Sequence, residues 1–195
     1  FDLSLAIPCY NEGAHLKSSV EILFDVLSQT KYRYEVVFVD DFSKDNTREI
    51  LLEICKNYLN CRYILHDKNY GRGAAFKTGY LNTTGAITGF IDIDLEIKPH
   101  YISPLVNLIG KNNYDVVTGY RHYEFSKTGA FHRVILSCGY RYLCRFLLGI
   151  KLNDTETGCK FFNRKTASTV VNSSTNNGWF WDTEVMVRSE LANLK

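Results

Sequence analysis

The feature that most constrains the fold is a regular alternation between short apolar runs and segments with helical spacing. The run Tyr34–Asp40 is rich in β-branched residues and almost continuously apolar, as strands buried on both faces of a sheet are. Helical spacing precedes it, carried by Leu16, Val20, Leu23 and Leu27. The alternation predicts an α/β fold with a Rossmann-like, doubly wound, mostly parallel sheet and helices on both faces.

The same patterns locate the individual elements. We expect strands at residues 3–8, 34–40, 62–66, 86–92 and 115–120, with a short strand at 161–162. We expect helices at residues 16–27, around 50–54, and at 73–81, 102–110, 132–149 and 164–171, with an aromatic turn at 179–181. No linker is visible, so the 195 residues are predicted to form one domain. Because the sequence stops within a helical pattern, we expect the domain to continue beyond its C-terminus.

Polar clusters follow three of the predicted strands. Asn11 and Glu12 follow the first strand, Asp40 and Asp41 the second, and the acidic segment 92–96 the fourth. Ligands of doubly wound sheets bind beyond the carboxyl ends of the strands. These clusters are therefore candidates for one binding site, in which Tyr10 can offer an aromatic face to a nucleobase. Each cluster taken singly is equally compatible with turn and helix-capping chemistry.

The acidic segment contains Asp92, Asp94 and Glu96. In an extended segment these three carboxylates would point to the same side, where they repel one another unless a cation neutralises them. Hard oxygen ligands suit Mg²⁺ or Mn²⁺. An acidic strand end exposed to water explains an isolated Asp-x-Asp equally well, so the metal site depends on the neighbouring motifs.

Composition and charge narrow the class of partner. A formal net charge of +2 is too small for a nucleic-acid binder, so phosphate recognition must come from a few placed cations. Six cysteines are scattered without a C-x-x-C pair, which is typical of reduced thiols in a cytoplasmic domain. No apolar run approaches the roughly 20 residues of a membrane span.

Four motifs in a fixed order resemble glycosyltransferase family 2, a family of inverting enzymes with the GT-A fold. They are Pro8-x-Tyr10-Asn11-Glu12, Asp40-Asp41-x-Ser43-x-Asp45-x-Thr47, Asn69-x-Gly71 and Asp92-x-Asp94. Within the family, the chain is most similar to the branch of dolichyl-phosphate mannose synthases and bacterial polyprenyl-phosphate glycosyltransferases. That likeness is carried by Asp92-x-Asp94-x-Glu96, Gly119-x-Arg121, Arg133 before an apolar helix, and Asp154-x-x-x-Gly158-x-Lys160.

The resemblance implies roles for these residues. Asp92, Asp94 and the side chain at position 96 would hold Mg²⁺ or Mn²⁺, and Asp94 would be essential for catalysis. Position 96 is often Gln in that branch, so Glu96 leaves the metal preference open. The nucleotide-sugar donor, with uracil or guanine as its base, would contact a further set of residues: Pro8, Tyr10, Glu12, Asp40, Asp41, Gly71 and Arg72.

The glycine-rich segment around Gly71 and Gly73 superficially matches a dinucleotide-binding fingerprint. Phe76 occupies the position that needs Gly or Ala, and the segment follows the third strand instead of the first, so we reject a dehydrogenase. Glycines before a helix still allow a ligand to approach the backbone closely. Arg72 is expected to reach the donor, whereas for Lys77 a surface role is equally compatible with the sequence.

The acceptor decides which groups catalysis requires. A polyprenyl or dolichyl phosphate is already anionic and needs positioning by cations, for which we predict Arg121, Arg133 and Lys160. A hydroxyl acceptor, such as a saccharide or polysaccharide precursor, would instead need a general base, and Asp182 is the candidate. A surface salt bridge is equally compatible with Arg133.

The segment 132–149 combines a wide apolar surface with arginines. It can lie at a membrane interface, although a core helix has the same periodicity. Peripheral contact could also come from segments outside this sequence. We therefore expect a glycosyltransferase that moves a hexose to a lipid phosphate at the cytoplasmic face of a membrane. The alternatives are a family 2 enzyme with a hydroxyl acceptor and a catalytically silent nucleotide-sugar-binding module.

Overall fold

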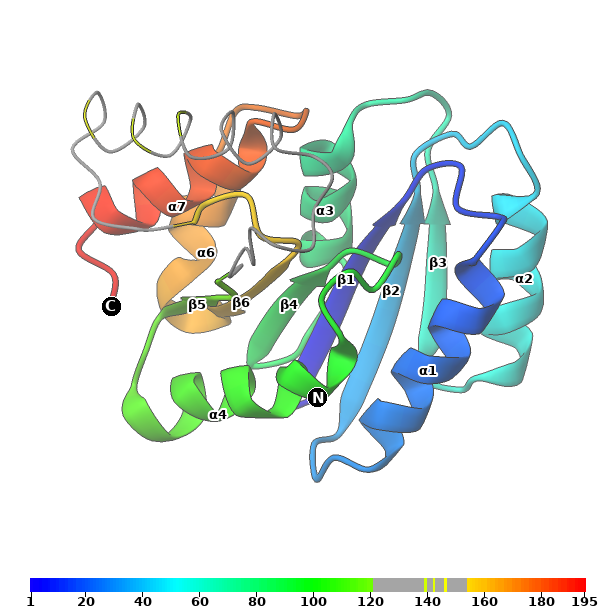
Figure 1. The fold of residues 1–195 in the computed structure, drawn as a ribbon, viewed down its shortest axis with the longest axis horizontal. Helices are drawn as coiled ribbons and strands as arrows, with labels where there is room; N and C mark the ends of the chain where they lie inside the picture. Colours follow the sequence, from blue (N-terminus) through cyan, green and yellow to red (C-terminus); the bar gives the residue numbers. More distant parts are fainter. Residues whose placement is uncertain (121–138, 140–141, 143–145, 147–153) are drawn as a thin grey trace.

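A computed structural model of the chain describes residues 1–120, 139, 142, 146 and 154–195. These residues form one six-stranded sheet with helices on both faces (Figure 1). The strands are β1 (Leu3–Cys9), β2 (Tyr34–Asp40), β3 (Cys61–Leu65), β4 (Ile87–Ile91), β5 (Val116–Thr118) and β6 (Cys159–Asn163). The helices are α1 (Leu16–Ser28), α2 (Thr47–Asn57), α3 (Arg72–Leu81), α4 (Ile102–Asn112), which follows a 3₁₀ turn (Pro99–Tyr101), α6 (Arg164–Ser173) and α7 (Trp181–Leu191).

The sheet has the strand order β3-β2-β1-β4-β6-β5. β1 pairs in parallel with both β2 and β4, and β2 pairs in parallel with β3. β6 lies antiparallel between β4 and β5. The predicted fold class, an α/β domain with a mostly parallel sheet, is confirmed, and the structure adds an antiparallel strand in the sheet interior.

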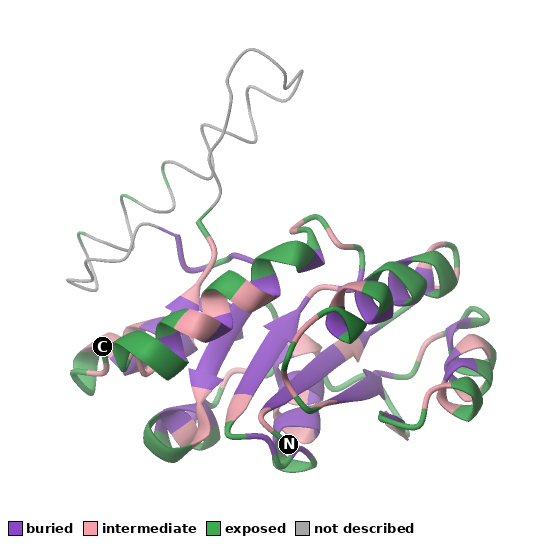
Figure 2. Cartoon of the chain, turned by 90° about the horizontal axis from the view of Figure 1, so that it is seen from below, coloured by how far each residue is buried: buried purple, intermediate pink, exposed green. Residues whose placement is uncertain are grey.

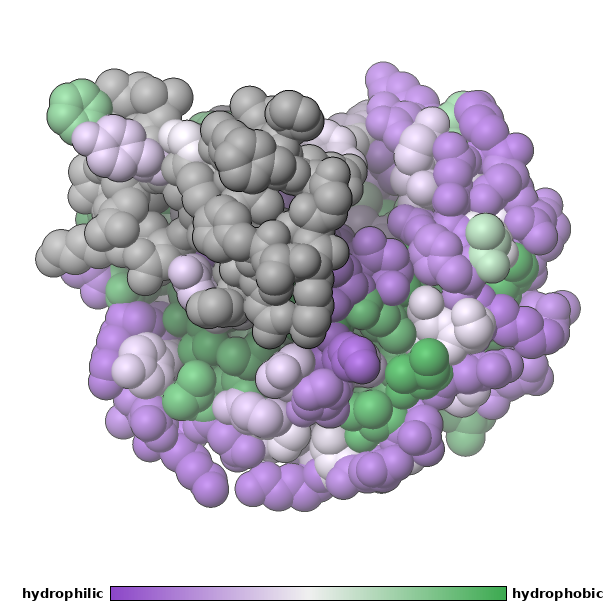
Figure 3. Space-filling view, in the orientation of Figure 1, coloured by the Kyte–Doolittle hydropathy of each residue, from purple (hydrophilic) through white to green (hydrophobic). Residues whose placement is uncertain are grey.

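Alternating strand residues build two cores on opposite faces of the sheet. Leu5 and Phe38 point toward α1, α2 and α4, whereas Ala6 and Phe90 point toward α3, α6 and α7. Figure 2 shows the strands buried between these layers, while the helices turn exposed residues outward. On the face covered by α1 and α4, the surface is hydrophilic at its rim and more hydrophobic near its centre (Figure 3).

Two predicted elements need correction. The short strand expected at 161–162 is the five-residue strand β6, and its apolar pair serves both cores because Phe161 packs on one face and Phe162 on the other. The aromatic turn expected at 179–181 ends one residue earlier, because Trp181 is the first residue of α7 and is completely buried. Of the predicted helix 132–149, the structure describes residues 139, 142 and 146, which are helical and exposed, and the rest of the prediction lies outside the described residues.

Within residues 1–120 and 154–195, no helix is long and apolar enough to cross a bilayer.

Candidate active site

A cavity of about 710 Å³ opens at the carboxyl ends of β1 and β4, where chain connections leave in opposite directions along the sheet. This switch point is the usual ligand site of a doubly wound sheet. The cavity is lined by Pro8, Cys9, Tyr10, Glu12, Asp41, Asn69, Gly71, Arg72, Asp92, Ile93, Asp94, Glu96, Glu156, Gly158, Gly178 and Trp179. The structure thus gathers the predicted motifs that follow β1, β2, β3 and β4 around one space.

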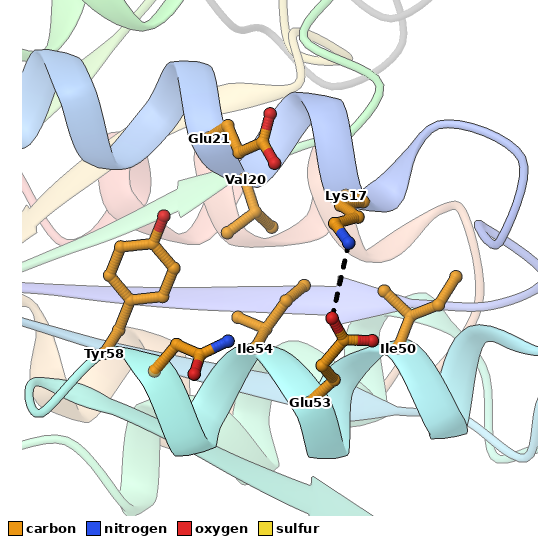
Figure 4. Close-up of a pocket in the computed structure, with 8 residues that line it drawn as sticks. Lys17, Val20, Glu21, Ile50, Glu53, Ile54 and Tyr58 are labelled. Atoms are coloured by element: carbon orange, nitrogen blue, oxygen red, sulfur yellow. Dashed lines mark hydrogen bonds and ion pairs between the residues drawn. The ribbon is translucent and has the colours of Figure 1, made fainter.

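A second hollow, of about 100 Å³, lies between α1 and α2 (Figure 4). Lys17 reaches across it to Glu53, with 3.3 Å between the ammonium nitrogen and the carboxylate oxygen. This volume is too small for a nucleotide, and drug-sized ligands need several hundred cubic ångströms. The hollow therefore has no part in the candidate site.

The acidic segment after β4 is a turn. β4 ends at Ile91, and Asp92 and Leu95 are joined by a hydrogen bond from the Leu95 N–H to the Asp92 carbonyl. Leu95 has a φ of 55°, in the left-handed region that bulky residues rarely adopt. The condition of an extended segment is therefore not met, because the sheet ends before Asp92. The turn nevertheless directs Asp92, Asp94 and Glu96 to the cavity.

Negative charge dominates the cavity wall. Six of its lining residues are acidic and one, Arg72, is basic. Burial raises the pKa of Glu12, and the nearby Asp94 and Asp92 raise it further against the effect of His15. Like charges this close together favour a bound cation.

The carboxylates also fit a divalent metal chemically, since Mg²⁺ and Mn²⁺ prefer oxygen ligands. In the described part of the chain, however, no three His, Cys, Asp or Glu side chains form a ready ligand set. A metal at Asp94 would therefore also take oxygen ligands from the bound substrate or from water. The assignment of Asp92, Asp94 and Glu96 as joint ligands stays a prediction.

Arg72 connects the acidic turn to α7. One terminal guanidinium nitrogen donates to both carboxylate oxygens of Asp92, each at 2.6 Å, and the other lies 2.8 Å from Asp182. The guanidinium also lies 4.8 Å from the ring centre of Trp179 and 4.7 Å from that of Phe90. Two carboxylates and two aromatic rings therefore fix the cation at the cavity wall.

Lys160 and Asp182 lie behind Arg72. Lys160 is fully buried, and its ammonium nitrogen lies 2.5 Å from one oxygen of Asp182, which is only 2% exposed. Lys160 also donates to the carbonyl of Thr157 at 2.5 Å. The structure places these two predicted site residues beneath the cavity wall, and neither lines the cavity.

Asp41 shapes the loop before α3. Its carboxylate accepts hydrogen bonds from the backbone N–H groups of Tyr70, at 2.8 Å, and Gly71, at 2.7 Å. It also lies 2.7 Å from His66, whose other ring nitrogen lies 3.0 Å from the hydroxyl of Thr78. Asp41 lines the cavity, whereas Asp40 is buried and accepts from the backbone N–H of Ser43.

Two glycines allow the close packing of the site. A Cβ at Gly158 would lie 1.9 Å from a carboxylate oxygen of Asp92, and the Gly158 carbonyl accepts the Asp92 backbone N–H at 2.9 Å. Gly71 has a φ of 100°, and a Cβ there would lie 2.4 Å from the carbonyl oxygen of Asn177. Both positions therefore require the absence of a side chain.

Gly178 and Trp179 line the cavity, and the segment 174–179 that carries them is held by hydrogen bonds. Glu184 accepts the backbone N–H groups of Thr175 and Asn176, and burial is outweighed by these bonds, so that its pKa falls to about 2. Lys77 donates to the carbonyl of Ser174 at 3.1 Å. This anchoring presents Trp179, which is 79% exposed, at the cavity.

Sequence reasoning did not identify every residue of the site. Glu156 and Trp179 were not predicted to face the cavity, and His66 was given no role at all. Glu156 lies inside the recognised Asp154–Lys160 motif, which was the available signal. Arg121 and Arg133, the predicted phosphate-binding arginines, lie outside the described residues.

Known proteins are similar to this chain in sequence. The family model "Glycosyl transferase family 2" matches residues 4–170. The chain is 27% identical to the glycosyltransferase AglD of Haloferax volcanii over 197 residues, covering 100% of this chain and 32% of AglD. It is 32% identical to the dolichyl-phosphate beta-glucosyltransferase of Saccharomyces cerevisiae over 209 residues, covering 95% of this chain and 61% of that enzyme.

A solved structure shows the same fold. Glucosyl-3-phosphoglycerate synthase from Mycobacterium tuberculosis, in complex with Mn²⁺, UDP-glucose and phosphoglyceric acid, matches with a TM-score of 0.70. The two sequences are 19% identical, and the match covers 96% of this chain and 64% of that chain. The chain thus spans between about a third and just under two thirds of the length of these relatives.

Proposed function

The chain belongs to glycosyl transferase family 2, and from this premise we propose that it is the catalytic domain of an inverting hexosyltransferase that uses a divalent metal. The donor is a nucleotide sugar and the acceptor is a polyprenyl or dolichyl phosphate at the cytoplasmic face of a membrane. The cavity at the switch point of the sheet, with six carboxylates and one fixed guanidinium, is the observation that carries this proposal.

The metal follows from the charge of the cavity. A diphosphate would be repelled by the acidic wall unless a cation neutralised it. Asp94, with Asp92 and Glu96 beside it, would hold Mg²⁺ or Mn²⁺, and the relative with Mn²⁺ and UDP-glucose supports this choice. When bound, the metal supplies charge stabilisation for the departing nucleoside diphosphate.

The donor is held by residues that follow the first three strands. Tyr10 offers an aromatic face to the base, and Glu12 can accept hydrogen bonds from the ribose hydroxyls. Asp41 holds the loop that carries Gly71, so that the backbone there stays close to the ligand. We propose UDP-glucose as the donor, supported by the glucosyltransferase relatives and by the neighbour with UDP-glucose.

The acceptor attacks the anomeric carbon from the side opposite the leaving nucleotide, which inverts the configuration. A phosphate oxygen is already anionic and needs no deprotonation at this step. Cations must instead position it, and we assign this role to Arg121 and Arg133. The names of the yeast and Dictyostelium discoideum relatives, both dolichyl-phosphate beta-glucosyltransferases, support a lipid phosphate.

A radiolabelled transfer assay tests the proposal. UDP-glucose and GDP-mannose are supplied in parallel, with Mn²⁺ or Mg²⁺ and a short polyprenyl phosphate. We expect label from UDP-glucose in the lipid fraction, and we expect chelation of the metal to abolish transfer. Metal-dependent donor hydrolysis without lipid product would instead favour a hydroxyl acceptor, and binding of a nucleotide sugar without turnover would indicate a silent binding module.

A further inference from the structure

The side chain of Asp182 has its two carboxylate oxygens bound to two different cations. One oxygen lies 2.5 Å from the ammonium nitrogen of Lys160, and the other lies 2.8 Å from a guanidinium nitrogen of Arg72. Asp182 is 2% exposed and does not line the cavity. A general base needs a free oxygen within hydrogen-bond reach of the acceptor, and this placement offers none.

Arg72, in contrast, lines the cavity and is fixed from behind. A guanidinium carries five N–H donors. The contacts with Asp92 and Asp182 use three of them, so the remaining donors can serve an anionic ligand. Asp182 sets the position of this cation from below, while Asp92 holds it from the side of the acidic turn.

We infer that Asp182 is a positioning residue, which with Lys160 holds Arg72 in place to bind the diphosphate of the donor. The inference rests on the proposed function and goes beyond it, because it gives Asp182, which a phosphate acceptor does not need as a base, a role in binding the donor. Lys160 orients Asp182 through a direct ion pair, and the fully buried ammonium group in turn requires this partner of opposite charge. The chain of contacts therefore links β6 and α7 to the donor subsite.

The arrangement also explains why a buried lysine lies in the middle of the sheet. Lys160 pairs in register with Phe90 of β4, and its ammonium group lies 5.6 Å from the centre of that ring. Arg72 packs against the same ring, at 4.7 Å. Both cations therefore contact the same aromatic residue and the same carboxylate, which couples their positions.

The test measures nucleotide binding without any acceptor. Isothermal titration of UDP and of GDP, each with Mn²⁺, is carried out on the wild type and on Asp182→Asn. We expect Asp182→Asn to raise the dissociation constant of the preferred nucleotide about tenfold, the size expected when one charge-assisted contact is lost. The donor KM should rise with it, while kcat falls by a smaller factor.

Two further variants distinguish a loss of Arg72 positioning from a general loss of stability. Asp182→Asn leaves Lys160 buried beside a neutral amide, which destabilises the fold, and the double variant Lys160→Met/Asp182→Asn removes that charge. We expect the double variant to recover thermal stability but to keep the weakened nucleotide affinity. Glu35→Gln is the matched control, because Glu35 is also a buried, ion-paired carboxylate but lies at the other end of the sheet. It should lower stability and leave nucleotide affinity unchanged.

The outcomes are distinct. If Asp182→Asn binds nucleotide as the wild type does while kcat falls more than about a hundredfold, Asp182 is a catalytic base and the inference is wrong. Equal loss of affinity in Glu35→Gln and Asp182→Asn would also overturn it, because the effect would then reflect stability alone. Failure of the wild type to bind either nucleotide would overturn the proposed function and, with it, the inference.

Discussion

Two carboxyl groups at opposite ends of the sheet, those of Glu35 and Asp92, have pKa shifts of opposite direction. Glu35, at the amino end of β2, accepts hydrogen bonds from the Thr84 backbone N–H at 2.6 Å, the Ser4 hydroxyl at 2.7 Å and the Arg62 guanidinium at 2.6 Å. Burial raises its pKa, but these bonds outweigh burial and hold the pKa below its usual value. At the amino end, the Glu35 carboxylate is therefore fully supplied with hydrogen-bond donors from the protein.

Asp92, at the carboxyl end of β4, is in the opposite situation. Its pKa is raised, chiefly by burial and also by the charges of Asp182 and Asp94, although Arg72 lowers it in part. Among the described residues that line the cavity, six are acidic and one, Arg72, is basic. Perturbed carboxyl groups of this kind concentrate at functional sites. The contrast indicates that a ligand binds at the carboxyl end of the sheet.

The largest expected effect is a loss of turnover when a carboxylate at the carboxyl end of the sheet is removed. Asp94→Ala should lower turnover about a thousandfold, because the cation that stabilises the leaving group loses its ligand. Asp94 is exposed, so the unfolding free energy should change by less than about 0.5 kcal/mol. Transfer assays and chemical denaturation measure the two quantities. An unchanged rate would refute the metal assignment.

A substitution at the amino end of the sheet should instead lower stability and leave nucleotide affinity unchanged. Glu35→Ala leaves the buried Ser4 hydroxyl and the Thr84 backbone N–H without this acceptor and should cost about 2 kcal/mol of unfolding free energy. Urea denaturation measures this loss, and titration with UDP and Mn²⁺ should give the wild-type affinity. The lowered pKa of Glu35 adds a pH signature. Its contribution to stability is present above the unfolded pKa and is lost as pH falls through the folded pKa, so the variant should show a flatter acid limb.

A divalent metal is expected to stabilise the protein through the carboxyl groups at the carboxyl end of the sheet. The pKa values of Asp92 and Glu12 are raised, so their contribution to stability is present at low pH and is lost as pH rises through these values. A bound cation removes that loss. At a concentration of about 100 times its dissociation constant, Mn²⁺ should add about 2.7 kcal/mol, which is roughly 5 °C or more in the unfolding midpoint.

The shift should be large at pH 7 and small near pH 4, where the carboxyl groups take up protons. Asp94→Ala serves as the control, since its shift at pH 7 should nearly disappear. Thermal unfolding followed by circular dichroism is sufficient for the measurement. An equal shift at both pH values would mean that Mn²⁺ binds elsewhere.

Much of the fold could be predicted because its strands are buried on both faces. Continuous apolar runs such as Tyr34–Asp40 carry a clear signal, and the structure has a strand at that place. The position of β6 between β4 and β5 could not be predicted, because periodicity reports local conformation and says nothing of strand order. The turn at Asp92–Leu95 was missed for a related reason: the sequence alternates as a strand does, but the partner strand ends.

The site was predicted where its residues follow strands directly. Tyr10, Glu12 and Asp94 line one cavity, as the topology of a parallel sheet requires, although their roles stay predictions. Contacts between side chains on elements far apart in the chain could not be predicted from the sequence. Nothing in the sequence indicates that Lys160 and Asp182 meet, since they are 22 residues apart on a strand and a helix.

The smallest effect is expected at the second hollow, between α1 and α2. Lys17 and Glu53 are 3.3 Å apart there, but their side chains are 63% and 61% exposed, so water screens the pair. Lys17→Met should change the unfolding free energy by less than about 0.5 kcal/mol, and it should leave transfer activity at the wild-type level. The same ionic interaction is thus expected to matter little at the surface and greatly at Asp182, where both partners are buried. A loss of activity in Lys17→Met, measured in the transfer assay, would mean that this hollow also serves the reaction.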